Sequence, residues 1–321
     1  MTFAANRPLT DQERARRLVQ RQRLDVQEAD DLSVIRFNTT YMEVVDKWFG
    51  LRGVLTTFSL ASILGVIVVW GASVVTFLGN PNLSHSDAWL WFGALAVLSV
   101  PFLWLMFFCL KSDAFRYTHY PVRLNRKTQT VHVFRFDGTV LSVPWKDLFF
   151  CIASLPQNNW AIQGHVLDKD GITVKETFAF PVTGTGAADR DQLPRYWEFV
   201  RRYMEEGPQS VAKHVQYCLP IADRRERFTD GFHRMHSWGA VAPFPIMIGV
   251  LLIYLATYPG RWLAMKTSKL PIWPQEIEDA CVVDPSDPYL KDASMNQPIT
   301  DHSLIYLVAA IGIGLLVWAG W

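Results

Sequence analysis

Two charge-free stretches decide the fold of this chain: VLTTFSLASILGVIVVWGASVVTFL at Val54–Leu78 and AWLWFGALAVLSVPFLWLMFFCL at Ala88–Leu110. They are 25 and 23 residues long, contain no Asp, Glu, Lys or Arg, and are separated only by Gly79–Asp87. A hydrocarbon core about 30 Å thick needs roughly 20 apolar residues of helix to cross it. Inside lipid an isolated segment must satisfy its own backbone hydrogen bonds, which favours helix over strand. The sequence therefore predicts a transmembrane helical hairpin.

The distribution of basic residues predicts which side of the membrane each part of the chain faces. Of the 31 Lys and Arg residues, nine lie in residues 1–53, none in 54–110 and 18 in 111–239. Because Lys and Arg are enriched on the cytoplasmic side of membrane spans, we expect the N-terminus and the long middle segment to be cytoplasmic. The net charge of only +1 gives no indication of a nucleic-acid partner.

Two later apolar runs, at residues 240–258 and 304–321, predict a third and a fourth span. The expected fold class is then four transmembrane helices plus a soluble α+β domain, residues 111–239, inserted between helices 2 and 3. Residues 1–53 form a cytoplasmic N-terminal segment, and residues 259–303 an external loop with four basic and seven acidic residues. Both termini of this multi-pass protein are expected in the cytoplasm.

The soluble segment is predicted to consist of strands followed by a helix. Short runs rich in β-forming residues flank an Asp-Gly turn and an Asp-Lys-Asp-Gly turn, a pattern typical of β-hairpins. A run of helix formers then ends at Gly207-Pro208, which is a helix stop signal. The expected strands are 121–125, 129–136, 139–143, 160–167 and 172–180, and the expected helix is 192–206.

The N-terminal segment contains a helix start signal. Thr10 followed by Glu13 fits a capping box, in which each residue satisfies a free backbone N–H of the first turn. The residues after it are good helix formers with few apolar positions, so we expect a solvated helix.

Few residues form a pattern typical of catalysis or cofactor binding. His233 and His236 are three residues apart but lack the third ligand of a metal site. Asp168 and Asp170 precede Gly171 and fit the turn of a hairpin better than a metal site. The four cysteines are scattered without a CxxC pair. We therefore expect no enzymatic activity, no cofactor, and neither catalytic nor metal-binding residues.

The apolar spans also argue against ion transport. A transport path usually carries ionisable groups inside its helices, because it must coordinate what it moves. The cores of the four predicted spans contain no Asp, Glu, Lys, Arg or His. They are expected to act as anchors or packing surfaces.

The predicted outer loop supplies the candidate binding residues. Trp273 and Tyr289 could serve as rigid aromatic anchors for a partner protein, since aromatic residues are favoured at binding hot spots. Glu276, Glu278 and Asp279 lie beside Trp273 and complete the candidate partner-binding set. The alternative is a solvated connector that is acidic because basic residues are disfavoured outside.

The segment PVRLNRKTQTVHVFRFDGTVLSVPWKDLFF (Pro121–Phe150) carries a motif. It resembles an uncharacterised family of bacterial membrane proteins in which two early transmembrane helices precede a cytoplasmic β-rich domain. The matching residues are Arg123, Asn125-Arg126-Lys127, Val131, Val133, Gly138 and Val143-Pro144-Trp145. Asn-Arg-Lys-Thr before a strand is also frequent in bacterial pleckstrin-homology-like domains, which makes such a domain one candidate here. Members are often encoded beside type VI secretion effectors, so the resemblance implies an immunity protein and offers no catalytic residues.

The leading hypothesis is therefore a non-enzymatic immunity protein of the bacterial inner membrane that binds and neutralises a cognate type VI secretion toxin, as in a toxin–antitoxin pair. Its spans would pack against the toxin, or residues 259–303, which would then be a periplasmic loop, would intercept the toxin outside. The alternative is a membrane-anchored signalling or scaffold protein whose cytoplasmic domain binds lipid or a protein partner. A third hypothesis, a membrane enzyme, would depend on polar residues such as Asp147 or His165. The expected partners are the toxin and the lipid bilayer, with homo-oligomerisation left open and nucleic acid excluded.

Overall fold

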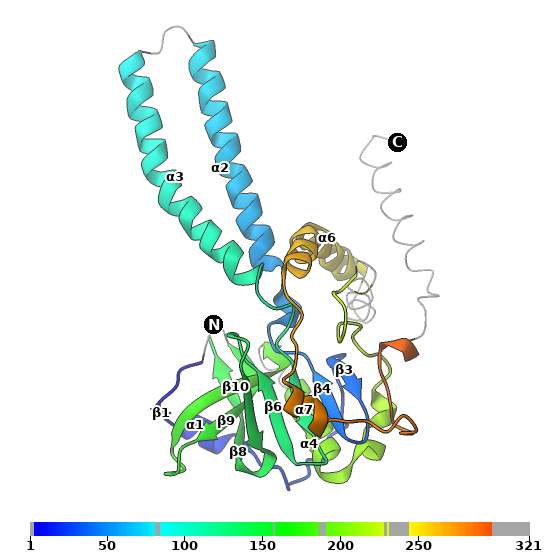
Figure 1. Cartoon of the computed structure of the whole chain (residues 1–321). Helices are drawn as coiled ribbons and strands as arrows, with labels where there is room; N and C mark the ends of the chain where they lie inside the picture. The colour runs from blue at the N-terminus through cyan, green and yellow to red at the C-terminus, as the bar shows by residue number, and fades with distance from the viewer. Residues whose placement is uncertain are drawn as a thin grey trace.

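A long helical hairpin projects from a β-rich domain in the computed structural model of the chain (Figure 1). The structure describes residues 3–80, 84–156, 158–185, 191–227, 230 and 244–296. The domain contains two five-stranded sheets in which every pairing between strands is antiparallel. The predicted helical hairpin and a domain rich in β-strands are both present.

The first sheet is built from residues on both sides of the hairpin. Its strands follow chain order as β3 (Val34–Phe37), β4 (Tyr41–Val44), β5 (Val122–Asn125), β6 (Thr130–Phe134) and β7 (Val140–Pro144). The hairpin is therefore an insertion between two neighbouring strands, β4 and β5, whose residues pair from Tyr41 opposite Asn125 to Val44 opposite Val122. This pairing brings the two ends of the hairpin back to the same edge of the domain.

The second sheet has the order β1-β10-β9-β8-β2. Its long central strands are β8 (Leu148–Leu155), β9 (Asn159–Leu167) and β10 (Thr173–Thr185), and its edges are the two-residue strands β1 (Arg7–Pro8) and β2 (Arg17–Leu18). Between these edges the N-terminal segment crosses the outer face of the sheet and forms the short helix α1 (Asp11–Ala15) there. The capping box predicted at Thr10 and Glu13 is present.

The main core lies between the two sheets and helix α4 (Gln192–Glu206), whose predicted range is confirmed. Aromatic side chains fill its centre: the rings of Trp145 and Trp197 are stacked 5.7 Å apart, and Phe150 packs 4.8 Å from each. Full burial of such large rings contributes several kcal/mol to stability. Single 3₁₀ turns occur at Phe49–Leu51, Trp145–Asp147, Pro208–Ser210, Ala212–His214 and Ala293–Met295.

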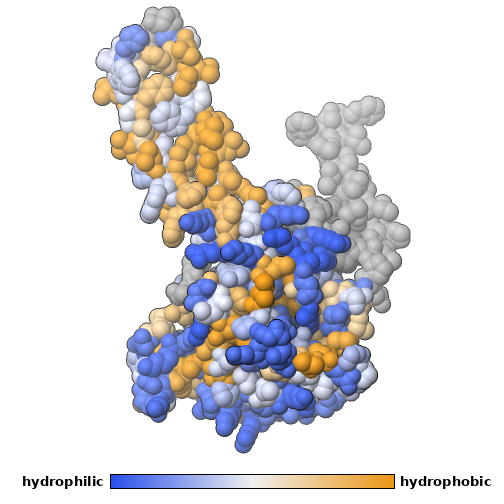
Figure 2. Space-filling view, in the orientation of Figure 1, coloured by the Kyte–Doolittle hydropathy of each residue, from blue (hydrophilic) through white to orange (hydrophobic). Residues whose placement is uncertain are grey.

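The hairpin consists of α2 (Val54–Gly79) and α3 (His85–Asp113). In the described part of the chain, the helical segments 49–79 and 85–113 are the two that are long and apolar enough to cross a membrane. Most of their apolar side chains face outward and form the hydrophobic arm of Figure 2. Asp113 joins the two ends, because its carboxylate accepts hydrogen bonds from the backbone N–H groups of Gly53 and Thr56 at 3.0 Å.

The predicted architecture of four transmembrane helices is wrong. Helix α6 (Phe244–Thr267) continues beyond the expected span and lies at the base of the hairpin (Figure 1). Residues 268–296, here called the strap, were predicted to lie on the other side of the membrane from the domain. They instead return to it: Lys291 forms a β-bridge with Phe37, and Lys269 with Tyr117. A single crossing by α6 would separate these pairs. The run at 304–321 lies outside the described residues.

A pleckstrin-homology-like domain confined between helices 2 and 3 is likewise wrong. Four of the ten strands in the two sheets, β1 to β4, come from residues 7–44, ahead of the hairpin. The strap adds helix α7 (Gln275–Ala280) to the same body. The domain therefore draws on three separated parts of the sequence, which its local patterns do not reveal.

Candidate functional site

The base of the hairpin is the point where α2, α3 and α6 meet the domain. Gly260 of α6 lies so close to α2 that an added Cβ would overlap Thr57 and lie 2.8 Å from the carbonyl oxygen of Gly53. The Thr57 hydroxyl donates to the carbonyl oxygen of Thr257 at 3.0 Å across this crossing. The small residues thus let α6 lie across the first turn of α2, which fixes the hairpin to the domain.

Two arginines close this junction from below. Arg52 donates from Nη1 to the backbone carbonyl of Asp113 at 2.7 Å and from Nη2 to the carbonyl of Tyr117. Arg261 forms an ion pair with Glu226 at 2.6 Å and donates to the carbonyl of Phe49 at 2.9 Å. These charges are buried and compensated, so they hold the helices in place and are not available to a ligand.

Other basic residues at the same level remain available. Lys111, Arg116, Lys266 and Lys269 are exposed, and none of the four has a carboxylate partner among the residues that the structure describes. Arg116 and Lys269 are neighbours, because the Lys269 N–H donates to the Arg116 carbonyl at 2.7 Å. Figure 2 shows hydrophilic side chains gathered directly below the apolar arm. We call these four residues the basic belt.

Aromatic side chains accompany the basic belt. Phe115 and Trp262 are 58% and 48% exposed, and Trp48 is half-buried with the Lys47 ammonium 4.9 Å from its ring. Burial lowers the pKa of Lys47 to about 8. Aromatic rings beside basic residues at the mouth of a span are typical of the membrane–water interface. The base of the hairpin therefore has the composition of an interfacial zone.

The strap carries the five residues predicted to bind a partner. Trp273 is buried against the first sheet, with its ring 5.8 Å from that of Phe134 in an edge-to-face arrangement. Glu278 is partly buried and forms an ion pair with Arg123 at 3.2 Å. Glu276 and Asp279 are exposed. Tyr289 is half-buried and packs on the main core.

These positions divide the predicted set. The contacts of Trp273, Glu278 and Tyr289 attach the strap to the domain, so these side chains serve the fold. Glu276 and Asp279 face solvent on α7 and stay available to a partner. The binding role assigned to the set stays a prediction.

Arg123 is the centre of the strap attachment, although the sequence indicates it only through the family-like motif. Its guanidinium lies 4.6 Å from the rings of both Tyr41 and Trp273. It also forms ion pairs with Glu43 at 2.8 Å and with Glu278. Strand β5, its neighbour β4 and the strap are therefore joined through one buried cation.

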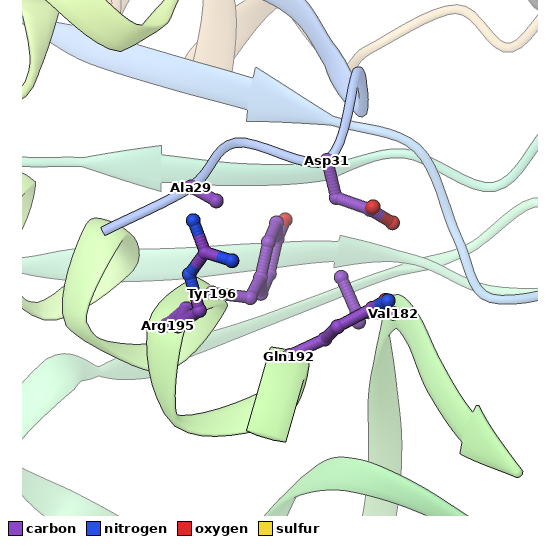
Figure 3. Close-up of a pocket in the computed structure, with 6 residues that line it drawn as sticks. All are labelled: Ala29, Asp31, Val182, Gln192, Arg195 and Tyr196. Carbon is purple, nitrogen blue, oxygen red and sulfur yellow. The ribbon is translucent and has the colours of Figure 1, made fainter. Parts of the chain in front are cut away.

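A small pocket opens beside the N-terminal end of α4 (Figure 3). Its cavity volume is about 190 Å³, and its lining residues are Ala29, Asp31, Val182, Gln192, Arg195 and Tyr196. Two of the lining side chains are already engaged, since Arg195 donates to the carbonyl of Gln27 at 3.0 Å and the Tyr196 hydroxyl lies 3.1 Å from that of Ser33. Ligand pockets generally enclose about 300–1,000 Å³. This pocket is therefore too small for most organic cofactors.

A buried polar cluster lies on the outer face of the second sheet. Cys151 Sγ in β8 is 3.3 Å from His165 Nε2 in β9, and the same nitrogen is 3.5 Å from Glu13 Oε1 in α1. His165 Nδ1 is 2.8 Å from the hydroxyl oxygen of Thr177 in β10. Arg7 donates to both oxygens of Glu13, at 2.6 and 2.8 Å. Cys151, His165 and Glu13 are all buried.

Burial sets the protonation of this cluster. It raises the pKa of the Cys151 thiol to about 12 and lowers the pKa of His165 to about 4. Burial also opposes ionisation of Glu13, but hydrogen bonds from Arg7 and Thr10 outweigh it and hold the pKa of that carboxyl at about 2. At neutral pH the cluster therefore contains a carboxylate, a neutral imidazole and a thiol.

Local sequence patterns indicate this cluster only in part. The capping box identifies Glu13, and His165 is one of the polar residues on which the membrane-enzyme hypothesis depends, but no spacing connects them to Cys151. Only the pairing of β8 with β9 and the crossing of α1 bring the three together. His233 and His236 lie outside the described residues. Asp168 and Asp170 form the predicted turn between β9 and β10, where Asp170 accepts from the N–H of Ile172 at 2.8 Å.

Comparison with known proteins identifies the family of the chain. Residues 99–285, more than half of the 321, match the model of a family of unknown function, DUF6708. The chain belongs to this family. The DUF6708 region starts within α3 and extends through strands β5 to β10, α4 and α6 into the strap. No curated protein and no solved structure matches the chain.

Proposed function

We propose that this DUF6708 protein is a membrane-anchored binding protein whose α2–α3 hairpin sits in the bacterial inner membrane. The observation that carries the proposal is the insertion of the hairpin between the paired strands β4 and β5. A hairpin that crosses the bilayer twice returns the chain to the side where it began, and this sheet requires that return. The strands before and after the hairpin then share one compartment.

The charge distribution supports the cytoplasm as that compartment. The basic belt lies at the base of the hairpin, and Lys and Arg are enriched on the cytoplasmic side of spans. The strap contacts the same domain through Phe37 and Tyr117, so the proposal assigns the strap to the cytoplasm as well. Binding to a partner outside through residues 259–303 is accordingly not part of the proposal.

The partner that we propose is a cognate type VI secretion toxin, which makes the chain an immunity protein that acts by binding. Its support is the resemblance at residues 121–150 and the presence of two helices long and apolar enough to cross a membrane. Two surfaces suit this role: the exposed apolar sides of α2 and α3 within lipid, and the acidic face of α7 at Glu276 and Asp279. The apolar sides of α2 and α3 would bind a toxin that inserts in the inner membrane.

Co-expression with the product of the adjacent gene tests the immunity proposal. When expressed alone and directed to the membrane, that product should arrest growth. It should be harmless when this protein is co-expressed. Replacement of residues 54–112 by a short Gly/Ser linker should abolish protection if the hairpin makes the contact. The ends of that segment adjoin, since Gly53 N–H donates to Asp113 at 3.0 Å. A neighbouring product without toxicity would refute the immunity proposal.

A second candidate function is a scaffold whose domain binds anionic lipid. The observation that favours it is the basic belt, whose four exposed cations lie beside Phe115 and Trp262 at the expected headgroup level. Each such cation near an anionic surface contributes about 1 kcal/mol. Replacing all four with Gln should weaken co-purification of anionic phospholipid under this hypothesis and should leave protection against a toxin intact.

A further inference from the structure

We infer that Glu13, Cys151 and His165 form a structural zinc site that fastens the N-terminal segment to the second sheet. The inference does not depend on the membrane function. It starts from the donor set: a carboxylate oxygen, a thiol sulfur and an imidazole nitrogen whose ligating atoms all lie within 4.8 Å of one another. These three atoms are the types that zinc prefers in proteins.

Two of the three distances between the ligating atoms are close to those around one tetrahedral ion. Zinc lies about 2.3 Å from sulfur and about 2.1 Å from nitrogen or oxygen. At a tetrahedral angle these bond lengths place sulfur about 3.6 Å from nitrogen, and nitrogen about 3.4 Å from oxygen. The corresponding distances here are 3.3 Å for Cys151 Sγ to His165 Nε2 and 3.5 Å for His165 Nε2 to Glu13 Oε1. These two distances need little change, and the third, from the Cys151 sulfur to a Glu13 oxygen, has to reach about 3.6 Å from within 4.8 Å.

The surroundings hold the imidazole in the orientation that ligation requires. His165 Nδ1 is 2.8 Å from Thr177 Oγ1, a residue directly opposite it in the β9–β10 pairing. With the proton on Nδ1 donated to this hydroxyl, Nε2 presents a lone pair toward Cys151 and Glu13. Such a second hydrogen bond is usual for histidines that bind metal. Two of the three ligands lie on the central strands of a sheet, which supports a fixed geometry.

Arg7 is the competitor for the ion. Its guanidinium neutralises Glu13 through the bonds at 2.6 and 2.8 Å, and its side chain is 27% exposed, which gives it room to turn outward. On zinc binding, the Cys151 thiol gives its proton to water as the sulfur–zinc bond forms. Glu13 loses its hydrogen bonds from Arg7 and binds the ion in their place. A water molecule is the expected fourth ligand, because no other Cys, His, Asp or Glu of the described chain joins this group.

Burial of all three ligands points to a structural role. The N-terminal segment enters at one sheet edge through β1 and leaves at the other through β2, so α1 crosses the face of β8 and β9 between them. An ion shared by Glu13 and the two strands would fix this crossing at its centre. Metal binding that occurs only in the folded state adds directly to folding stability.

The test uses full-length protein in detergent, stripped with chelator and titrated with Co²⁺ as a spectroscopic substitute and then with Zn²⁺. We expect about one ion per chain, a thiolate-to-cobalt absorption band, and a rise in the melting temperature with zinc. Cys151→Ser should lose the band and His165→Gln should bind at least tenfold more weakly, whereas Cys218→Ser, a second buried thiol outside the cluster, should bind like the wild type.

Arg7→Gln provides a variant in which binding should improve. Removal of the competing guanidinium should increase zinc affinity at least tenfold and enlarge the stabilisation by zinc. A purely structural Arg7–Glu13 ion pair predicts the opposite: a less stable protein that zinc does not restore. Absence of stoichiometric metal from the wild type, or a cobalt band that persists in Cys151→Ser, would overturn the inference.

Discussion

Arg123 in strand β5 and Trp273 in the strap are in direct contact, with the guanidinium carbon 4.6 Å from the centre of the indole ring. Local sequence patterns assign these residues to opposite sides of a membrane. Their contact requires one compartment for both, and it joins the first sheet to the strap. A domain that lies entirely on one side of the membrane, anchored by the hairpin, depends on contacts of this kind.

Arg123→Met should destabilise the protein by about 3–5 kcal/mol, because it leaves Glu43 buried and unpaired. Arg116→Met, at an exposed position in the basic belt, should change stability by no more than about 0.5 kcal/mol. Thermal and denaturant unfolding in detergent measure both. Equal stability of the two variants would mean that the buried pair does not hold the strap.

Gly260→Val should loosen the junction of α6 with α2. The new side chain would overlap Thr57, and overpacking of this kind costs about 1–3 kcal/mol. Gly71→Ala, also in a helix of the anchor, meets no atom within 4 Å and should be neutral. Protease sensitivity at the end of α6 and melting temperature report the difference. A neutral Gly260→Val would show that the crossing is loose.

Local signals explain what the sequence predicted correctly. The hairpin followed from two long charge-free runs, and the β9–β10 turn from Asp168 to Gly171, where the side chains bond to nearby backbone N–H groups. Helix α4 has its predicted bounds of Gln192–Glu206. In each case the residues that determine the structure lie within the element itself.

The errors have a common physical cause, which is that the deciding partners are distant in sequence. The apolar run at residues 240–258 suggested a third span. Helix α6 continues beyond this run through Arg261, whose charge is neutralised by Glu226 and whose N–H groups donate to backbone carbonyls. Strands of two to four residues in 7–44 are specified by pairing with strands far along the chain. The cluster of Glu13 with Cys151 and His165 likewise has no sequence spacing of its own.

Stability should fall as the pH drops from about 6.5 to about 4. Burial lowers the pKa of His132 to about 4, with the charge of Arg123 as a second cause, and burial lowers that of His119 to about 3. At these two histidines the unfolded chain binds more protons than the folded one in this window, so their contribution to stability falls with acid, whereas Asp30, whose pKa burial raises to about 6, contributes in the opposite direction. Denaturant titrations of the wild type and His132→Gln measure how the free energy of unfolding changes with pH, and this slope should decrease by up to about 1.4 kcal/mol per pH unit in the variant. Equal slopes in the two proteins would contradict a neutral, buried His132.

The side of the membrane on which the strap lies distinguishes a one-sided domain from a chain that crosses the membrane at α6. Two exposed serines are suitable for single cysteine substitution: Ser86 at the outer end of α3, and Ser286 in the strap. Labelling with a membrane-impermeant maleimide in intact spheroplasts and after lysis reports the compartment of each. The wild type is the control, since Cys151, Cys218 and Cys281 are buried and Cys109 lies within α3.

With a transmembrane hairpin and a cytoplasmic strap, Ser86→Cys should be labelled in intact spheroplasts and Ser286→Cys only after lysis. Labelling of Ser286→Cys from outside would place the strap across the membrane from the hairpin's base and would contradict the one-sided domain. Failure of Ser86→Cys to react from outside, while it reacts after lysis, would contradict the transmembrane hairpin itself.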